Sequence, residues 1–221
     1  MMKKVISVLM IFALVFAFAG CAANNSSSKT ASSQAKKSTS DEADKKTTNS
    51  KSLVVYFSRT GEQYGVGVIE KGNTAIVADM IAEQTGADTF EIKPKTDNYP
   101  TSYSELTDYA KDELNNNARP EIASAVENFD SYSTIYLGYP IWWGDMPMIC
   151  YTFLESYDFS GKTIVPFCTH AGSSDAGTTS KIQSAVPKAE VKDVLAISGT
   201  DAQKKQDSVK TTVTEWLSGM E

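Results

Sequence analysis

The chain has few of the side chains that usually bind metal ions. It contains one histidine, His170, and three cysteines in 221 residues, with no Cys-x-x-Cys pair and no cluster of histidines. Structural zinc sites and iron–sulfur clusters take several such ligands at short spacing. The sequence therefore predicts that the protein holds no metal ion.

Positive charge is scarce over most of the chain. Residues 1–52 contain eight Lys and Arg and three Asp and Glu, so their formal net charge is +5. The whole chain has a formal net charge of −6, which leaves −11 for residues 53–221. A nucleic-acid-binding surface has to neutralise phosphates with Lys and Arg. We therefore expect no nucleic acid as a partner.

The first 21 residues have the layout of a secretory signal. Two lysines precede an apolar run over residues 5–19, and small residues precede Cys21. The run is shorter than the ~20 apolar residues that span a membrane. The tail FAGC resembles the lipobox of bacterial lipoproteins, which implies a lipidated Cys21 and an extracytoplasmic location on the bacterial cell membrane. An ordinary secretory signal and an uncleaved anchor are the alternatives.

The next segment, residues 22–52, contains no Leu, Ile, Val, Phe, Tyr or Trp. Such a composition cannot bury enough apolar surface to offset the entropy lost on folding. We expect a flexible polar tether, with a binding segment as the less favoured reading. The folded domain is then expected over residues 53–221.

The remaining sequence alternates between strand and helix patterns. This alternation predicts a doubly wound α/β fold, a five-stranded parallel sheet in a three-layer α/β/α arrangement. Cys150 and Cys168 stand in apolar runs, which favours free thiols over the disulfide that export would permit. The expected strands are 53–58, 87–92, 133–140, 162–170 and 191–198, and the expected helices are 73–86, 104–117, 147–158, 179–186 and 202–218.

The loop after the first strand carries donors that suit a phosphate. The candidate residues carry hydroxyl, guanidinium and amide groups, and an insertion over residues 62–72 separates them into two sets. The second set begins a predicted helix, and a helix N-terminus favours the binding of anions. Helix capping by the same side chains is the alternative. The candidate phosphate-binding residues are Ser58, Arg59, Thr60, Asn73 and Thr74.

Two further loops follow the third and fourth strands, at the edge where doubly wound folds bind ligands. The first offers indole rings for stacking on a flat ligand, although such rings can also cap the core; its candidates are Pro140, Ile141, Trp142, Trp143 and Gly144. The second offers a polar, glycine-containing edge; its candidates are Thr169, His170, Ala171, Gly172 and Ser173. His170 could relay protons, but a hydrogen-bonding wall residue is the preferred reading.

With these motifs the domain resembles the flavodoxins, from residue 53 to about residue 217. The specific matches are GYPIWWG, DFSGK at 158–162, PFCTHAGSS at 166–174, and a phosphate loop that is split by an insertion. The resemblance implies bound flavin mononucleotide (FMN), with its phosphate in the split loop and its ring between the other two loops. Tyr99 and Tyr103 would border the ring. Ala171 departs from the glycine common in that family.

Three functions remain open. The first is an electron carrier that docks a basic redox partner through its acidic surface. The second is an NAD(P)H-dependent quinone or flavin oxidoreductase, and the third is a flavin-free binding lipoprotein. No catalytic side chain is assigned. The insertion at 62–72 is too apolar for a plain loop, and we expect a small hairpin beside the flavin site that shapes access or docks a partner.

Overall fold

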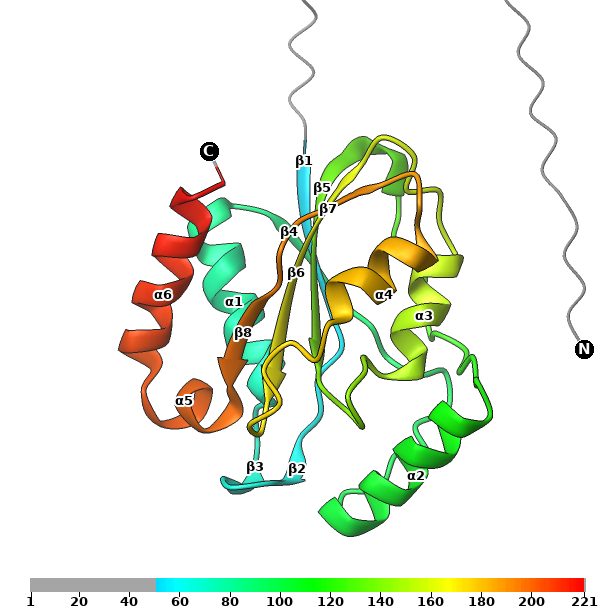
Figure 1. Cartoon of the computed structure of the whole chain (residues 1–221), viewed down its shortest axis with the longest axis vertical. Helices are drawn as coiled ribbons and strands as arrows, with labels where there is room; N and C mark the ends of the chain where they lie inside the picture. The colour runs from blue at the N-terminus through cyan, green and yellow to red at the C-terminus, as the bar shows by residue number, and fades with distance from the viewer. Residues whose placement is uncertain (1–50, 221) are drawn as a thin grey trace, which may run out of the picture. The chain divides into compact units, whose positions relative to one another are not determined.

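The computed structural model describes residues 51–220, and a parallel sheet lies at its centre (Figure 1). Every pairing in this sheet is parallel, in the order β4-β1-β5-β6-β7, with β8 also pairing with β6. The predicted doubly wound α/β fold is therefore confirmed. The strands are β1 (Lys51–Tyr56), β4 (Asp88–Glu91), β5 (Tyr132–Pro140), β6 (Thr163–His170), β7 (Glu190–Val191) and β8 (Leu195–Ser198).

The expected signal over residues 1–21, and the tether up to residue 50, lie outside the described residues. Lys51 and Ser52, which we assigned to the tether, instead begin β1. They pair with Tyr132 and Thr134 of β5, so the ordered strand starts two residues before its apolar run.

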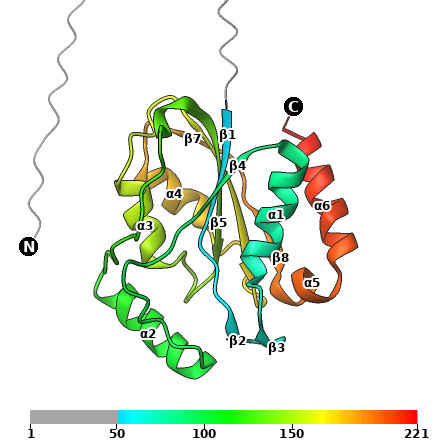
Figure 2. The same cartoon turned by 180° about the vertical axis from the view of Figure 1, so that it is seen from behind.

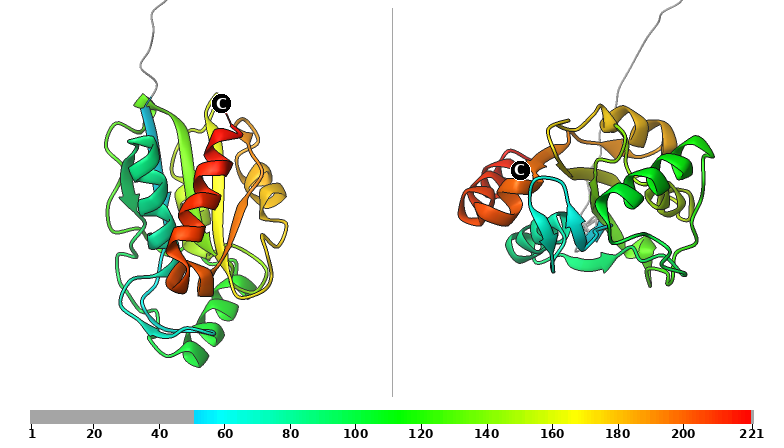
Figure 3. Two further views of the ribbon diagram at one scale, coloured as in Figure 1. Left: turned by 90° about the vertical axis from the view of Figure 1, so that its left-hand side faces the viewer. Right: turned by 90° about the horizontal axis from the view of Figure 1, so that it is seen from below.

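Helices cover both faces of the sheet (Figures 1 and 2), and the end-on view of Figure 3 separates the two groups. One face carries α1 (Asn73–Thr85), α5 (Gly199–Lys204) and α6 (Gln206–Ser218). The other carries α2 (Tyr103–Asn115), α3 (Met148–Glu155) and α4 (Thr178–Ala185), and the short 3-10 helix η1 (Phe129–Ser131) precedes β5.

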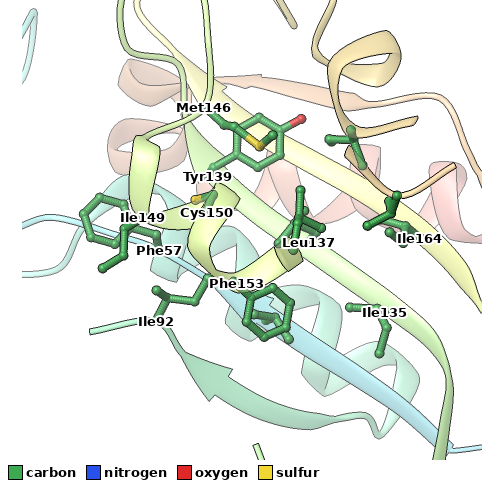
Figure 4. Close-up of a cluster of buried hydrophobic side chains, with 14 of the residues drawn as sticks. Phe57, Ile92, Ile135, Leu137, Tyr139, Met146, Ile149, Cys150, Phe153 and Ile164 are labelled. Atoms are coloured by element: carbon green, nitrogen blue, oxygen red, sulfur yellow. The ribbon is translucent and has the colours of Figure 1, made fainter. Parts of the chain in front are cut away.

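The alternation of side chains along β1 separates two hydrophobic clusters. Leu53, Val55 and Phe57 point into the cluster under α3, whereas Val54 points into the cluster under α1. Figure 4 shows the first cluster, in which Tyr139 and Phe153 are fully buried. Each face of the sheet is thus covered by its own packed layer, as expected for a sheet with continuous apolar strands.

Helix α1 forms where the apolar spacing predicted it. Ile76, Val77, Met80 and Ile81 are buried on one side. The helix ends at Gly86, which has φ 65° and donates its N–H to the Ala82 carbonyl at 2.9 Å. A left-handed glycine of this kind is a common helix C-cap, so α1 ends one residue before the predicted bound at residue 86.

The predicted last strand, 191–198, is two short strands, β7 and β8. The register against β6 changes from Ile164↔Val191 to Phe167↔Leu195, so the edge chain has one extra residue between them. The Ile164 carbonyl accepts the Lys192 N–H, and the next β6 residue facing this edge is Pro166. Because proline has no N–H to donate, the pairing is interrupted there.

The predicted last helix, 202–218, is also two helices. At Lys205 the backbone leaves helical geometry, with φ −137° and ψ 46°. Its N–H closes α5 on the Asp201 carbonyl, and its carbonyl accepts the Val209 N–H at the start of α6. The turn lets both helices pack against α1.

Candidate functional site

A cavity of about 360 Å³ opens at the carboxyl ends of β5, β6 and β8. Its size falls within the ~300–1,000 Å³ typical of small-molecule sites. Its position agrees with the rule that doubly wound folds bind ligands at this edge. Fifteen residues line it: Gln63, Tyr64, Asn73, Tyr103, Leu106, Thr107, Ala110, Pro140, Ile141, Trp142, Trp143, Thr169, His170, Ala171 and Gly199.

The two halves of the split first loop meet in space. The Ser58 hydroxyl accepts the N–H of Ala75, in the first turn of α1, at 3.1 Å. A Cβ added to Gly72 would lie 2.1 Å from Ser58 Oγ and 2.5 Å from the Arg59 carbonyl, so only glycine permits this approach. Ser58 therefore accepts a first-turn N–H of α1, as an N-cap side chain does, although the insertion separates it from the helix in the sequence.

The start of α1 joins the first loop to the third. Thr74 is 1% exposed, and its hydroxyl lies 2.9 Å from that of Thr169, which is 3% exposed. Asn73 lines the cavity, and its side-chain oxygen accepts from Gln203 at 2.9 Å. Among the described residues, the backbone N–H groups of Asn73 and Thr74 have no hydrogen-bond partner. Two helix-terminal donors thus remain for an anion.

Arg59 and Thr60 do not line the cavity. The Arg59 guanidinium pairs with Asp97 at 2.7 Å, donates to the Tyr99 carbonyl at 2.9 Å and lies over the Tyr99 ring. These contacts direct its charge to the loop after β4. Thr60 is exposed, and its carbonyl receives a long contact from Gln63 at 3.5 Å.

The second loop is a tight turn. Trp142 and Asp145 exchange backbone hydrogen bonds at 2.8 and 3.0 Å, and Trp143 and Gly144 between them have φ of 52° and 73°. Positive φ at both central positions is the geometry of a type I′ turn, which glycine favours at the second of them. Gly144 shapes the turn and does not line the cavity.

Asp145 is the residue that fixes this turn, and it was not among the predicted site residues. It is 8% exposed; one carboxylate oxygen accepts from the Met146 N–H at 2.8 Å and the Tyr151 hydroxyl at 3.1 Å. The other oxygen pairs with Lys181 of α4 at 2.9 Å. Lys181 also donates to the Gly144 carbonyl at 2.8 Å. The turn is thereby attached to α3 and α4.

The two tryptophans have different surroundings. Trp142 is half-buried and packs edge-on against Phe57 and Tyr99, with ring centroids 5.5 and 5.6 Å apart. Trp143 is 52% exposed and donates its indole N–H to the Thr107 carbonyl of α2 at 2.8 Å. Tyr99, which we expected at the ring border, is 6% exposed and supports Trp142 from behind without lining the cavity.

Helix α2 forms one wall of the cavity, and none of its residues was among the candidate cofactor-binding residues. Tyr103, Leu106, Thr107 and Ala110 all line the cavity. Their spacing of i, i+3, i+4 and i+7 places them on one helical face. This stripe was visible in the sequence and would have identified the wall.

The third loop contributes its first residues to the cavity. Thr169, His170 and Ala171 line it, while Gly172 and Ser173 lie on exposed backbone beyond the wall. The His170 ring nitrogen Nδ1 accepts the Gly172 N–H at 3.0 Å. Burial lowers the pKa of His170 below its ordinary value, and Asp201 opposes that shift. A neutral, hydrogen-bonding wall histidine is the role that this geometry supports.

The insertion forms the expected hairpin, β2 (Gly61–Gln63) and β3 (Gly67–Ile69). It lies beside the cavity, which Gln63 and Tyr64 line. Its base is attached to the start of α2, because Glu62 donates its N–H to the Thr101 carbonyl at 2.9 Å and its carboxylate accepts the Tyr103 N–H at 3.0 Å.

These residues fit the flavin mononucleotide implied by the sequence. Among the described residues, the N–H groups of Asn73 and Thr74 have no hydrogen-bond partner, and they lie next to the close backbone contact that only glycine permits at position 72. This arrangement suits a phosphate that is held by neutral donors. The half-buried Trp142 and the exposed Trp143 suit a flat ring. Within residues 51–220, no group of three or more His, Cys, Asp or Glu could hold a metal ion, and Cys150 and Cys168 are free, buried thiols. No helix in that range is long and apolar enough to cross a membrane.

Comparison with known proteins gives a consistent result. A family model described as flavodoxin matches residues 51–218. A candidate flavoprotein from Bacteroides uniformis is 30% identical, with a TM-score of 0.61 over 75% of this chain and 98% of that one. A flavoprotein from Lactobacillus acidophilus, solved in complex with FMN, is 21% identical, with a TM-score of 0.54 over 72% of this chain and 99% of the other. The comparison with curated proteins finds no match.

Proposed function

Because the chain belongs to the flavodoxin family, we propose that it binds FMN in this cavity and carries electrons between redox partners. The observation that carries the proposal is the reassembly of the split loop at Gly72, directly beside the aromatic cavity. FMN, when bound, supplies the redox chemistry, and the protein supplies binding, orientation and electrostatics.

The residues have distinct tasks in this proposal. The N–H groups of Asn73 and Thr74 hold the phosphate without a cationic side chain. Trp142 and the loop at Thr169–Ser173 enclose the ring, and neutral His170 donates a hydrogen bond from the nitrogen that Gly172 does not occupy. The buried Thr74–Thr169 hydroxyl pair fixes the two loops relative to each other.

The cavity wall has few titratable side chains and leaves the redox chemistry to the flavin, which suits an electron carrier. Within the described residues, His170 is the only titratable side chain of the cavity wall besides Tyr64 and Tyr103. An acidic domain suits docking of a basic redox protein by electrostatic steering, and a quinone is the alternative partner. The runner-up function is an NAD(P)H-dependent quinone or flavin oxidoreductase.

FMN titration of the purified chain tests the proposal. The chain should bind FMN with a flavin absorption band. Asn73→Ala should weaken FMN binding more than riboflavin binding, because Asn73 lies at the helix terminus that is assigned to the phosphate. Thr107→Ala, on the opposite wall, should affect both ligands equally. A colourless chain that takes up no FMN would refute the proposal. Steady consumption of NADPH with a quinone would favour the runner-up.

The location is a separate part of the proposal. The FAGC sequence supports lipidation of Cys21, with residues 22–50 as a tether that holds the domain at the outer face of the bacterial cell membrane. One lipid chain binds membranes only marginally and several bind firmly. Cys21→Ser should move the protein from the membrane to the soluble fraction. A variant that stays uncleaved in the membrane would show that the apolar segment is itself the anchor.

A further inference from the structure

Exposed aromatic side chains gather at the mouth of the cavity. In the described part of the chain, the large hydrophobic side chains that are exposed are Tyr64, Val68, Tyr103 and Trp143, with exposed fractions of 63, 81, 37 and 52%. Three of these four line the cavity, and Val68 lies on the same hairpin as Tyr64. Such a concentration of apolar surface at a cavity mouth indicates a place where something binds.

The aromatic rings come from separate segments that the fold holds together. Tyr64 lies in the turn of the inserted hairpin, Tyr103 is the first residue of α2, and their ring centroids are 5.8 Å apart. The Glu62 carboxylate, on the Tyr103 N–H, fixes the hairpin to the helix at this point. Trp143 is held to the same helix through Thr107. A second aromatic wall thus stands apart from Trp142, which packs on Phe57 in the core.

At this wall, away from the start of α1 that is assigned to the FMN phosphate, the charges disfavour an anionic ligand. None of the fifteen residues that line the cavity is Lys or Arg. Glu62 lies at the mouth, and the charge of Asp201 acts on His170. The nearby cation Lys111 is placed over the Trp143 ring, 4.7 Å from its centroid. A nicotinamide dinucleotide would bring its phosphates close to Glu62, and the nearby cation Lys111 already lies over the Trp143 ring, whereas an uncharged ring needs no cation.

We propose that Tyr64, Tyr103 and Trp143 form an aromatic subsite that takes an uncharged planar ring, of the quinone class, at the mouth of the cavity. The proposal rests on the proposed function, because the subsite adjoins the cavity assigned to FMN. It names the acceptor class for that site, gives the inserted hairpin a role, and excludes nicotinamide dinucleotides as ligands of the subsite. Offset or edge-on stacking supplies the recognition.

Calorimetric titration of the oxidised, FMN-loaded full chain with menadione tests this subsite. Tyr64→Ala should weaken menadione binding about three- to ten-fold, from the loss of one stacking contact. Tyr64→Phe should restore it. Val68→Ala is the matched control, since Val68 is exposed on the same hairpin but does not line the cavity. Val68→Ala should bind FMN as the parent chain does, and the Tyr64 variants are titrated with menadione only after each has been saturated with FMN. NADPH should bind at least ten-fold more weakly than menadione.

Two results would overturn the subsite: unchanged menadione binding in Tyr64→Ala, or NADPH binding as tight as that of menadione. Failure of the proposed function would look different, because the chain would then take up no FMN at all. The same menadione titration on the flavin-free chain still compares Tyr64→Ala with Val68→Ala in that case. Circular dichroism shows that each variant is folded before it is titrated.

Discussion

The turn at residues 142–145 and the split loop at residues 58–74 lie at the same edge of the sheet, but different interactions hold them. The turn depends on the buried carboxylate of Asp145, which contacts Lys181, Tyr151 and the Met146 N–H. The split loop depends on close backbone approach at Gly72 and on one hydroxyl, that of Ser58.

This difference shows where each loop is vulnerable. Loss of a buried charge partner leaves other polar groups unsatisfied, which is costly in a low-dielectric surrounding. An added methyl group at a close backbone contact forces the chain apart, without any loss of hydrogen-bonding groups. Removal of a polar side chain should therefore destabilise the turn at residues 142–145. Addition of a small apolar group should instead distort the split loop at residues 58–74.

Asp145→Ala should have the largest effect. Lys181, Tyr151 and the Met146 N–H would lose their shared acceptor, and we expect the free energy of unfolding to fall by about 3 kcal/mol. The turn would also hold Trp142 less firmly, so FMN should bind more weakly. Urea unfolding and FMN titration measure the two effects. Asp193→Ala, at an exposed position, is the control and should change neither. Equal stability of the two variants would contradict the role given to Asp145.

Gly72→Ala should have the next largest effect. The new Cβ would lie 2.1 Å from Ser58 Oγ, so Ser58 and Ala75 would have to separate. Overpacking of this kind costs about 1–3 kcal/mol. FMN affinity should fall more than riboflavin affinity, because the distortion falls on the phosphate side. Gly219→Ala is the matched control: its Cβ would lie 3.5 Å or more from its neighbours. If Gly72→Ala bound FMN normally, the reassembled loop would not be the phosphate site.

The sequence was a good guide to elements built from local patterns. Helix α1 and strand β5 begin and end within one residue of the predicted bounds, 73–86 and 133–140. The interruption of the last strand was not predicted because its cause, Pro166, lies on a neighbouring strand. The register between strands, and thus the position of a missing donor, is a tertiary property.

Within the site, the sequence predicted the loops better than the individual contacts. Eight of the fifteen candidate cofactor-binding residues line the cavity, among them Asn73, Trp142 and His170. Thr74 was correctly placed at the helix start, but its hydroxyl is bonded to Thr169, a partner 95 residues away. Asp145 was missed because an aspartate beside glycine also suits an exposed turn, and its burial depends on α4.

The smallest expected effect is in the third loop, where the side chain that lines the cavity, His170, can be titrated. His170 Nδ1 accepts the Gly172 N–H, and burial lowers the pKa of His170 below its ordinary value of 6.5. The folded state therefore binds this proton less readily than the unfolded state does. Stability from this group should be fully present above about pH 6.5 and should decline as the pH falls below that value. His170→Gln should remove this dependence between pH 7.5 and 5.5 in urea unfolding. Since the chain has a single histidine, its NMR titration is unambiguous, and a pKa at or above 6.5 would contradict a neutral, buried acceptor.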